Sequence, residues 1–145
     1  MENNTAYIKS NQITEVKYNR FTKGYADELE RDDISIATRQ KIGQNLLNYL
    51  CDKYKIVRVK LNVTERPRLQ RGNAQIYGRY GLNTKSIVIY NTTPKTHKEV
   101  SGKSFFDTLI HEFCHHLDYN FYKLDNSLHT KGFYMRINDL KNKLR

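Results

Sequence analysis

The stretch LIHEFCHHLDY, at residues 109–119, contains two histidines four positions apart, with a glutamate directly after the first. Apolar residues recur around them at helical spacing, at positions 106, 109, 110, 113 and 117, which predicts a helix with one buried face. Histidines four apart on a helix lie one turn apart on nearly the same side, so both imidazoles can bind one metal ion. We expect this helix to begin after Ser104 as N-cap, with Asp107 as its capping partner, and to end near Tyr119.

The motif HExxH, formed by His111, Glu112 and His115, has the composition of a catalytic zinc site. Zinc lowers the pKa of a water molecule from about 15.7 towards about 7, and a neighbouring carboxylate can accept the proton. We therefore predict Zn²⁺ as the cofactor, with Glu112 as the general base. The alternative is an ordinary helix with two solvated histidines, but four of the five histidines lie within residues 111–129, which favours a metal site.

A zinc site needs a third protein ligand. No glutamate follows Glu112, and the pattern HExxHxxGxxH fails because Asp118 and Phe121 occupy the positions of its glycine and third histidine. His129, fourteen residues after His115, is the leading candidate. The candidates that remain open are His97, His116 and Asp125. Asp118 is better suited to hydrogen bonding with a ligand histidine, unless it is a surface carboxylate.

Hydrophobic spacing and turn residues predict the other elements. After an N-cap at Asp33 or Ser35, a helix should run to about residue 53, and another should follow Thr130. Strands are predicted at 57–63, 75–80 and 86–90, with a loop at 65–73 and a turn at 81–83. Phe21, Tyr25 and Leu29 suggest a short earlier helix. The predicted fold class is α+β: N-terminal helices, a short three-stranded sheet, the HExxH helix and a C-terminal helix.

A chain of 145 residues has enough material for one hydrophobic core, so we expect a single domain over 1–145, in which segment 1–33 has no clear pattern. No apolar run reaches the roughly 18 to 20 residues of a membrane span, and the polar first residues do not resemble a signal peptide. Cys51 and Cys114 are too few for a disulfide framework or a four-cysteine zinc site. These features predict a cytoplasmic protein without a membrane partner.

The chain has a formal net charge of +10, and its distribution is uneven. Residues 53–79 contain eight lysines and arginines against one acid, Glu65; Tyr54 and Tyr77 are interspersed, and Tyr80 follows directly. A basic surface with aromatic residues is typical of contact with DNA or RNA. The alternative is a solvated sheet face with core tyrosines, and the lysine content can also reflect an AT-rich genome.

Four segments occur in a characteristic order: YGRYG at 77–81, SIVIY at 86–90, LIHEFCH at 109–115 and HTKGF at 129–133. Over about residues 75–137 the chain thereby resembles the SprT-like zinc metallopeptidases. The resemblance implies a zincin-like fold, zinc ligands at His111, His115 and His129, and Glu112 as general base. Thr130 departs from the glycine that commonly follows the third histidine in that family, and the chain lacks the cysteines for the zinc ribbon of many members.

The leading hypothesis is a zinc-dependent endopeptidase acting on a protein or peptide, with DNA-associated proteins as the substrates that the family implies. One alternative is a non-catalytic nucleic-acid-binding or regulatory module with a structural metal site. Another is a different HExxH peptidase, such as a regulator-cleaving protease of mobile elements. We expect the strand at 86–90 to pair with the substrate, because it is the strand nearest in sequence to the HExxH helix. Cys114 is expected to pack in the core, and Tyr119, Tyr122 and Tyr134 are either core residues or donors to the reacting oxygen.

Overall fold

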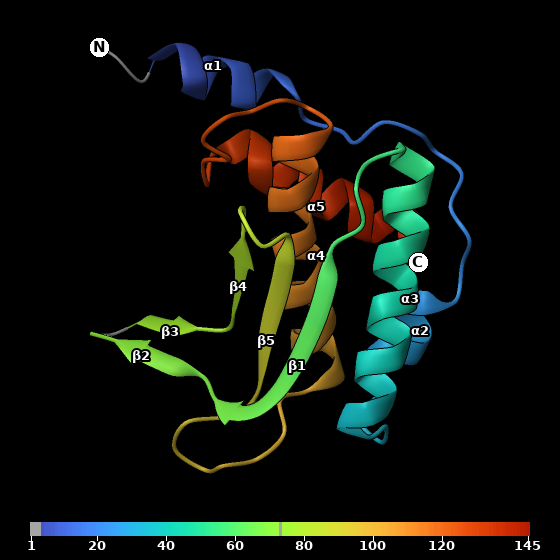
Figure 1. Cartoon of the computed structure of the whole chain (residues 1–145), viewed down its shortest axis with the longest axis vertical. Helices are drawn as coiled ribbons and strands as arrows, with labels where there is room; N and C mark the ends of the chain where they lie inside the picture. Colours follow the sequence, from blue (N-terminus) through green and yellow to red (C-terminus); the bar gives the residue numbers. More distant parts are fainter. Residues whose placement is uncertain (1–3, 73) are drawn as a thin grey trace.

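The computed structural model describes residues 4–72 and 74–145, which form a small α+β domain (Figure 1). The predicted fold class is therefore correct at this level. In chain order the elements are α1 (Asn4–Gln12), α2 (Tyr25–Leu29), α3 (Ile36–Tyr54), β1 (Lys60–Pro67), β2 (Leu69–Arg71), β3 (Ala74–Ile76), β4 (Gly78–Gly81), β5 (Ser86–Thr92), α4 (Gly102–Asn120) and α5 (Lys131–Leu144). In this part of the chain, no helix combines the length and the apolar character that crossing a membrane requires.

The two longest predicted helices outside the HExxH motif are confirmed. Of the two N-caps considered for α3, Ser35 is the correct one: its Oγ accepts a hydrogen bond from the backbone N–H of Thr38 at 3.1 Å. Thr130 caps α5 in the same way, through the N–H of Phe133 at 3.0 Å. In the first 33 residues, α2 includes Tyr25 but begins after Phe21, and α1 was not predicted.

The prediction that Ser104 caps the HExxH helix is wrong by three residues. Ser101 is the N-cap, and its Oγ accepts from the N–H of Ser104 at 3.1 Å. The helix can start earlier because Gly102 packs directly on the backbone after α2, where an added Cβ would lie 2.3 Å from the carbonyl oxygen of Arg31. Asp107 is not a capping residue; it forms an ion pair with Lys141 at 3.1 Å.

The main sheet has three strands in the order β1-β5-β4, with β5 parallel to β1 and antiparallel to β4. β5 is thus the central strand. β1 starts later than predicted and runs to Pro67, through the segment expected to be a loop, because its pairing with β5 continues past an irregularity to Thr92. The predicted turn at 81–83 connects β4 to β5.

The predicted strand at 75–80 is divided between two sheets. Its first part, β3, pairs with β2, which lies in the predicted loop, and only its second part, β4, joins the main sheet. The β2–β3 hairpin projects from the sheet, and most of its residues are exposed (Figure 1). Such a hairpin has no buried face, so it leaves no alternating hydrophobic pattern in the sequence.

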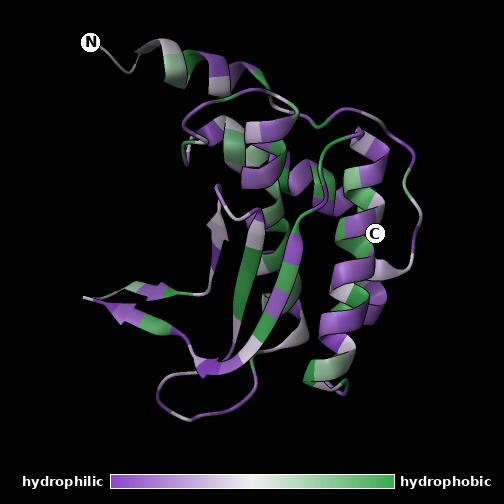
Figure 2. Ribbon diagram, in the orientation of Figure 1, coloured by the Kyte–Doolittle hydropathy of each residue, from purple (hydrophilic) through white to green (hydrophobic). Residues whose placement is uncertain are grey.

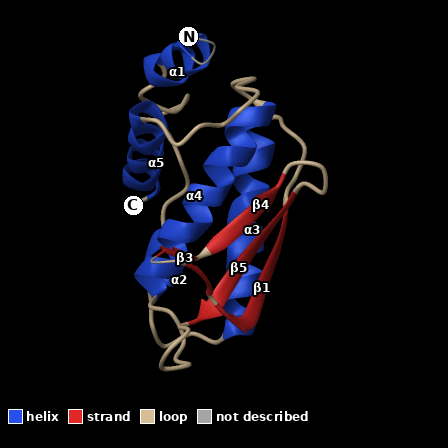
Figure 3. Ribbon diagram, turned by 90° about the vertical axis from the view of Figure 1, so that its left-hand side faces the viewer, coloured by secondary structure: helices blue, strands red, loops and turns tan. Residues whose placement is uncertain are grey.

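One face of the main sheet packs against the helices. Leu61, Val63, Ile87 and Ile89 are buried there, whereas the alternate residues of β1, such as Lys60 and Asn62, are exposed. Figure 2 shows hydrophobic residues along α4, β1 and β5, and Figure 3 shows the helices on one side of the strands. The core therefore lies between the sheet and α3, α4 and α5, and the other face of the sheet is open.

Candidate metal centre

Three histidines from two elements meet beside the sheet. His111 and His115 lie one turn apart on α4, and His129 comes from the segment just before α5. One ring nitrogen of each lies within 4.8 Å of the others, and the Nε2 atoms of His115 and His129 are 3.0 Å apart. In a tetrahedral zinc site, Zn–N bonds of about 2.0 to 2.1 Å put ligand nitrogens about 3.3 Å apart. Three imidazole nitrogens at this spacing can bind a single metal ion.

The other predicted candidates are not part of this cluster. In the described part of the chain, the ligand-type residues close enough to share an ion are His111, His115 and His129. His97 lines a separate hollow with Glu65 and Glu99. Asp125 is exposed in the loop after α4. His116 points away from the cluster and bonds to Val57 and Tyr80 instead.

Hydrogen bonds to His116 show what it does instead. Its Nε2 donates to the carbonyl oxygen of Val57 at 2.7 Å, because a carbonyl can only accept. Its Nδ1 must then accept, and it does so from the hydroxyl of Tyr80 at 2.7 Å and from the amide of Asn120 at 3.2 Å. His116 is fully buried and connects α4 to β4 and to the chain before β1. It is a structural residue.

The environment keeps His111 and His115 in the neutral form that metal binding requires. Burial, with a smaller contribution from the neighbouring His129, lowers the pKa of His111 to about 4. Burial lowers the pKa of His115 to about 3, with contributions from His111 and His129. Near pH 7 both rings therefore carry a free nitrogen lone pair.

Asp118 reaches His115 through Ser127, a loop residue without a distinguishing sequence signal. Nδ1 of His115 is 2.7 Å from Oγ of Ser127, and this hydroxyl lies 3.0 Å from Oδ2 of Asp118. Asp118 is fully buried, so the surface-carboxylate alternative is excluded. Its predicted hydrogen bonding to a ligand histidine is therefore indirect.

Glu112 lies beside the histidines, where two hollows meet. Its Oε2 is 3.9 Å from Nε2 of His111, and burial raises the pKa of this carboxyl to about 7. A hollow of about 370 Å³ extends from Glu112 between α4 and the β3–β4 segment. A second, of about 340 Å³, extends from Glu112 and His115 towards Tyr80 and Tyr119. Together they form a cleft along β4, with the three histidines and a carboxylate at its middle.

No protein-family model, curated protein or solved structure matches this chain.

Gly78 sets the distance between β4 and α4. A Cβ at this position would lie 2.8 Å from the carbonyl oxygen of Val88, 2.9 Å from Cγ2 of Thr108 and 3.5 Å from Cγ of Glu112. Only a residue without a side chain lets the strand approach the helix this closely, directly opposite Glu112. The YGRYG segment was singled out in the sequence, but the role of its first glycine, Gly78, could be understood only from this contact.

The remaining predicted residues have ordinary surroundings. Cys114 is buried and packs in the core, as expected. The hydroxyl of Tyr122 accepts a hydrogen bond from the backbone N–H of Lys17, so it is not directed at the cleft. Tyr134 is about half exposed, and its ring centroid lies 6.2 Å from that of His111.

Proposed function

We propose that this protein is a zinc-dependent endopeptidase with a zincin-like site. The proposal rests on one observation above all: the three converging imidazoles and Glu112 occupy the middle of a cleft that is open along β4. The order of motifs that resembles the SprT-like metallopeptidases supports the same function. Membership of that family is part of the proposed function.

The donor set fits zinc. Three neutral imidazoles are a known ligand set for catalytic zinc, which keeps a further position open for water or substrate. His111, His115 and His129 would hold the ion, which when bound supplies a Lewis acid that polarises a peptide carbonyl and makes water acidic.

Glu112 supplies the proton transfers. Its carboxylate accepts a proton from the attacking water as the water oxygen bonds to the peptide carbonyl carbon. When the C–N bond breaks, the same carboxyl returns the proton to the leaving nitrogen. The burial of Glu112 and its position next to His111 keep the carboxylate at the centre of the cleft.

The substrate strand needs a free sheet edge, and the predicted strand does not offer one. Residues 86–90 form most of β5, which is paired with β1 on one side and with β4 on the other. The prediction that this strand pairs with the substrate is therefore wrong. The outer edge of β1 is also covered. The side chains of Gln40 and Gln44 on α3 bond to the backbone of Leu61, and Gln40 also accepts from the N–H of Val63.

β4 has the sheet edge that faces the cleft. No other segment in the described ranges pairs with its outer side. The N–H of Tyr90 donates to the carbonyl of Tyr77, so alternate residues of β4 point their backbone groups towards β5. The N–H and C=O groups of Gly78 and Tyr80 therefore point outwards, where an extended peptide can pair with them. This is the substrate path that we propose.

Two measurements test the proposal. Elemental analysis should find close to one zinc per chain in the wild type, and the Glu112→Gln variant should retain it. Cleavage of an unfolded protein should fall by at least about 100-fold in that variant, as expected when a general base is lost. A Glu112→Gln protein with undiminished cleavage would contradict this mechanism. A zinc-loaded wild type that cleaves neither free unfolded proteins nor DNA-bound ones would favour the non-catalytic alternative.

A second candidate function, nucleic-acid binding, is favoured by the open face of the sheet. Lys60 and Asn62 on β1, Val88 on β5 and Arg79 on β4 lie on this face, because Asn62 and Arg79 are the register partners of Val88. Tyr90, two residues beyond Val88, is on the same face, and none of these residues is acidic. Cations beside an aromatic ring on a sheet suit single-stranded nucleic acid.

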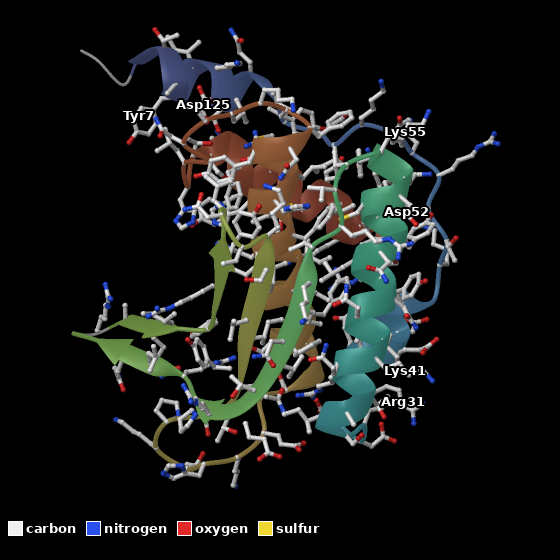
Figure 4. All side chains as sticks on the ribbon, in the orientation of Figure 1. Tyr7, Arg31, Lys41, Asp52, Lys55 and Asp125 are labelled. Carbon is white, nitrogen blue, oxygen red and sulfur yellow. The ribbon has the colours of Figure 1, made fainter. Side chains whose placement is uncertain are left out.

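The basic segment at 53–79 does not form the single surface that its sequence suggested. Lys55 lies at the end of α3, as labelled in Figure 4, near the start of β1, whereas Arg66 lies near the other end of that strand. Arg58 pairs with Asp52 at 2.7 Å. Arg68 packs over the ring of Tyr77, with its guanidinium 3.9 Å from the ring centroid. Of the three tyrosines considered for stacking, Tyr77 is the exposed one.

Salt dependence tests this second function. Binding of single-stranded DNA should weaken by roughly 0.7 log units per phosphate contact for each tenfold rise in salt. Replacing Lys60, Arg66 and Arg79 by Ala should flatten that slope. Replacing the exposed Lys41, Lys95 and Lys98 by Ala is the matched control. Equal effects of the two triple replacements would contradict a nucleic-acid site on the sheet.

A further inference from the structure

The hydrogen bonds around Ser127 fix the tautomer of His115. A serine hydroxyl has one hydrogen, and a carboxylate can only accept, so Ser127 donates to Asp118. Its oxygen must then accept from N–H at Nδ1 of His115. The Nε2 atom consequently carries the lone pair, and it is this atom that faces His129 at 3.0 Å. The ligating atom of His115 is thus selected by Ser127 and Asp118.

Asp118 depends on a buried cation. Its Oδ2 also forms an ion pair with Arg136 of α5 at 2.9 Å, and neither side chain is exposed by more than 1%. A buried charge is tolerated when it is paired and hydrogen-bonded. Without Arg136, Asp118 would lose the neighbouring positive charge that keeps its buried carboxylate ionised. An ionised carboxylate is an acceptor only.

Arg136 is in turn held by the N-terminal segment. Its Nη1 donates to the carbonyl oxygens of Ser10 at 2.6 Å and Ile13 at 2.7 Å. These bonds span more than 120 positions of sequence and join the end of α1 to the interior of α5. The guanidinium is therefore oriented by backbone atoms that no side-chain substitution in that segment removes.

The same segment packs against the start of α5, next to His129. The hydroxyls of Ser10 and Thr130 are 2.8 Å apart, and the amide oxygen of Asn11 accepts from the N–H of Gly132 at 2.8 Å. A Cβ at Gly132 would lie 2.3 Å from the carbonyl oxygen of Ser10, so the contact requires glycine. Figure 4 shows Tyr7 of α1 and Asp125 of the loop after α4 at the same end of the molecule.

We propose that segment 10–13 is part of the metal centre: through Arg136, Asp118 and Ser127, it holds His115 in the tautomer that presents Nε2 to the ion. These are positioning residues, since Ser127 alone touches a ligand and none touches the reacting atoms. The inference rests on the proposed zinc site. Residues 10–13 thereby act on a site more than 100 positions away in the sequence.

The test measures zinc affinity by competition with a chromophoric chelator. Loss of hydrogen bonds to a ligand histidine typically weakens metal binding by 10-fold to 100-fold. We expect a loss of that size for Ser127→Ala, and recovery for Ser127→Thr, which restores the hydroxyl. Visible absorption of the cobalt-substituted protein should change in Ser127→Ala and return in Ser127→Thr, since it reports the ligand geometry directly.

The role of the N-terminal segment is tested with Gly132→Ala, which displaces Ser10 without altering any side chain of the relay. We expect at least a 10-fold loss of zinc affinity. Two control variants make the same kinds of substitution away from the metal centre. Ser35→Ala matches Ser127→Ala and removes the N-cap of α3, and Gly43→Ala matches Gly132→Ala and crowds Leu61 in the core. Both should bind zinc like the wild type, with circular dichroism confirming that each metal-free variant is folded.

The outcomes separate this inference from the proposed function. A wild type that binds no zinc would overturn the metal site itself. A zinc-binding wild type whose affinity is unchanged in Ser127→Ala would overturn the relay while leaving the site intact. A loss of zinc affinity in Ser127→Ala without a loss in Gly132→Ala would overturn the positioning role assigned to segment 10–13.

Discussion

His115 and His116 are neighbours in sequence, yet they face different surroundings because successive residues on a helix are about 100° apart. His115 presents Nε2 to His129, whereas His116 bonds to Val57 and Tyr80 in the interior. The residue type alone does not separate a ligand from a structural histidine. The spacing separates them, because His115 lies four positions after His111 and shares a helix face with it, whereas His116 does not.

Two substitutions should therefore have opposite effects. His116→Ala leaves the carbonyl of Val57 buried without a donor, so the free energy of unfolding should fall by about 1 to 3 kcal/mol, while zinc is retained. His129→Ala removes an exposed side chain, so stability of the metal-free protein should change by less than about 0.5 kcal/mol, while zinc is lost. Urea unfolding and elemental analysis measure both quantities.

His97→Ala is the control for this pair, because His97 is an exposed histidine outside the cluster. It should change neither stability nor zinc content. Full zinc occupancy in the His129→Ala protein would mean that the third ligand has been assigned wrongly.

The edges of the sheet decide which element can bind a substrate. Nearness in sequence to the HExxH helix pointed to β5, but topology makes β5 the central strand and leaves β4 beside the cleft. Sheet order depends on pairings between distant segments, which a period-2 pattern does not contain. The positions of the strands in the sequence were therefore partly predictable, whereas the order in which the strands pair in the sheet was not.

Elements with a clear period and a cap were found from the sequence. The N-caps Ser35 and Thr130 and the buried face of α5 are local signals, and the HExxH spacing brings its two histidines together on any helix. Ser127 and Arg136 left no comparable signal. One is a loop serine and the other resembles a surface cation of α5, and their roles arise only when segments far apart in sequence meet.

The contact of β4 with α4 leads to a prediction at Gly78. Gly78→Ala must displace either the backbone of β5 or Thr108, because both lie within 3.0 Å of the added Cβ. The strand should move away from Glu112, so cleavage should fall by about 10-fold to 100-fold, the loss expected for a misplacement of about 1 Å. Zinc content should be unchanged.

The control for this change is Gly24→Ala, which strains a backbone with φ of +111° but has no atom within 4 Å of its Cβ. This variant should lose stability and keep its cleavage rate per folded molecule. Normal turnover by Gly78→Ala, measured at matched zinc content, would contradict the role of the β4 edge.

The cluster joins two parts of the whole molecule. α4 is a core helix in contact with the sheet, whereas His129 belongs to the connection at 121–130, which has no regular secondary structure. That connection is held at Ser127 and at Thr130, and a bound ion would add a third attachment at His129. Metal binding should thus stabilise the molecule as a whole and order this connection in particular.

Zinc should accordingly raise the free energy of unfolding by about 4 kcal/mol when free zinc exceeds its dissociation constant by about 1,000-fold, since it binds the folded chain preferentially. Thermal unfolding with and without a chelator measures this stabilisation, and hydrogen exchange should show the largest gain in protection at residues 121–130. The Glu112→Gln protein should gain the same stabilisation, because Glu112 is not a ligand. The His129→Ala protein should gain little, because it lacks the attachment that connects the two parts. Equal stabilisation of both variants would mean that zinc binds at some other place on the chain.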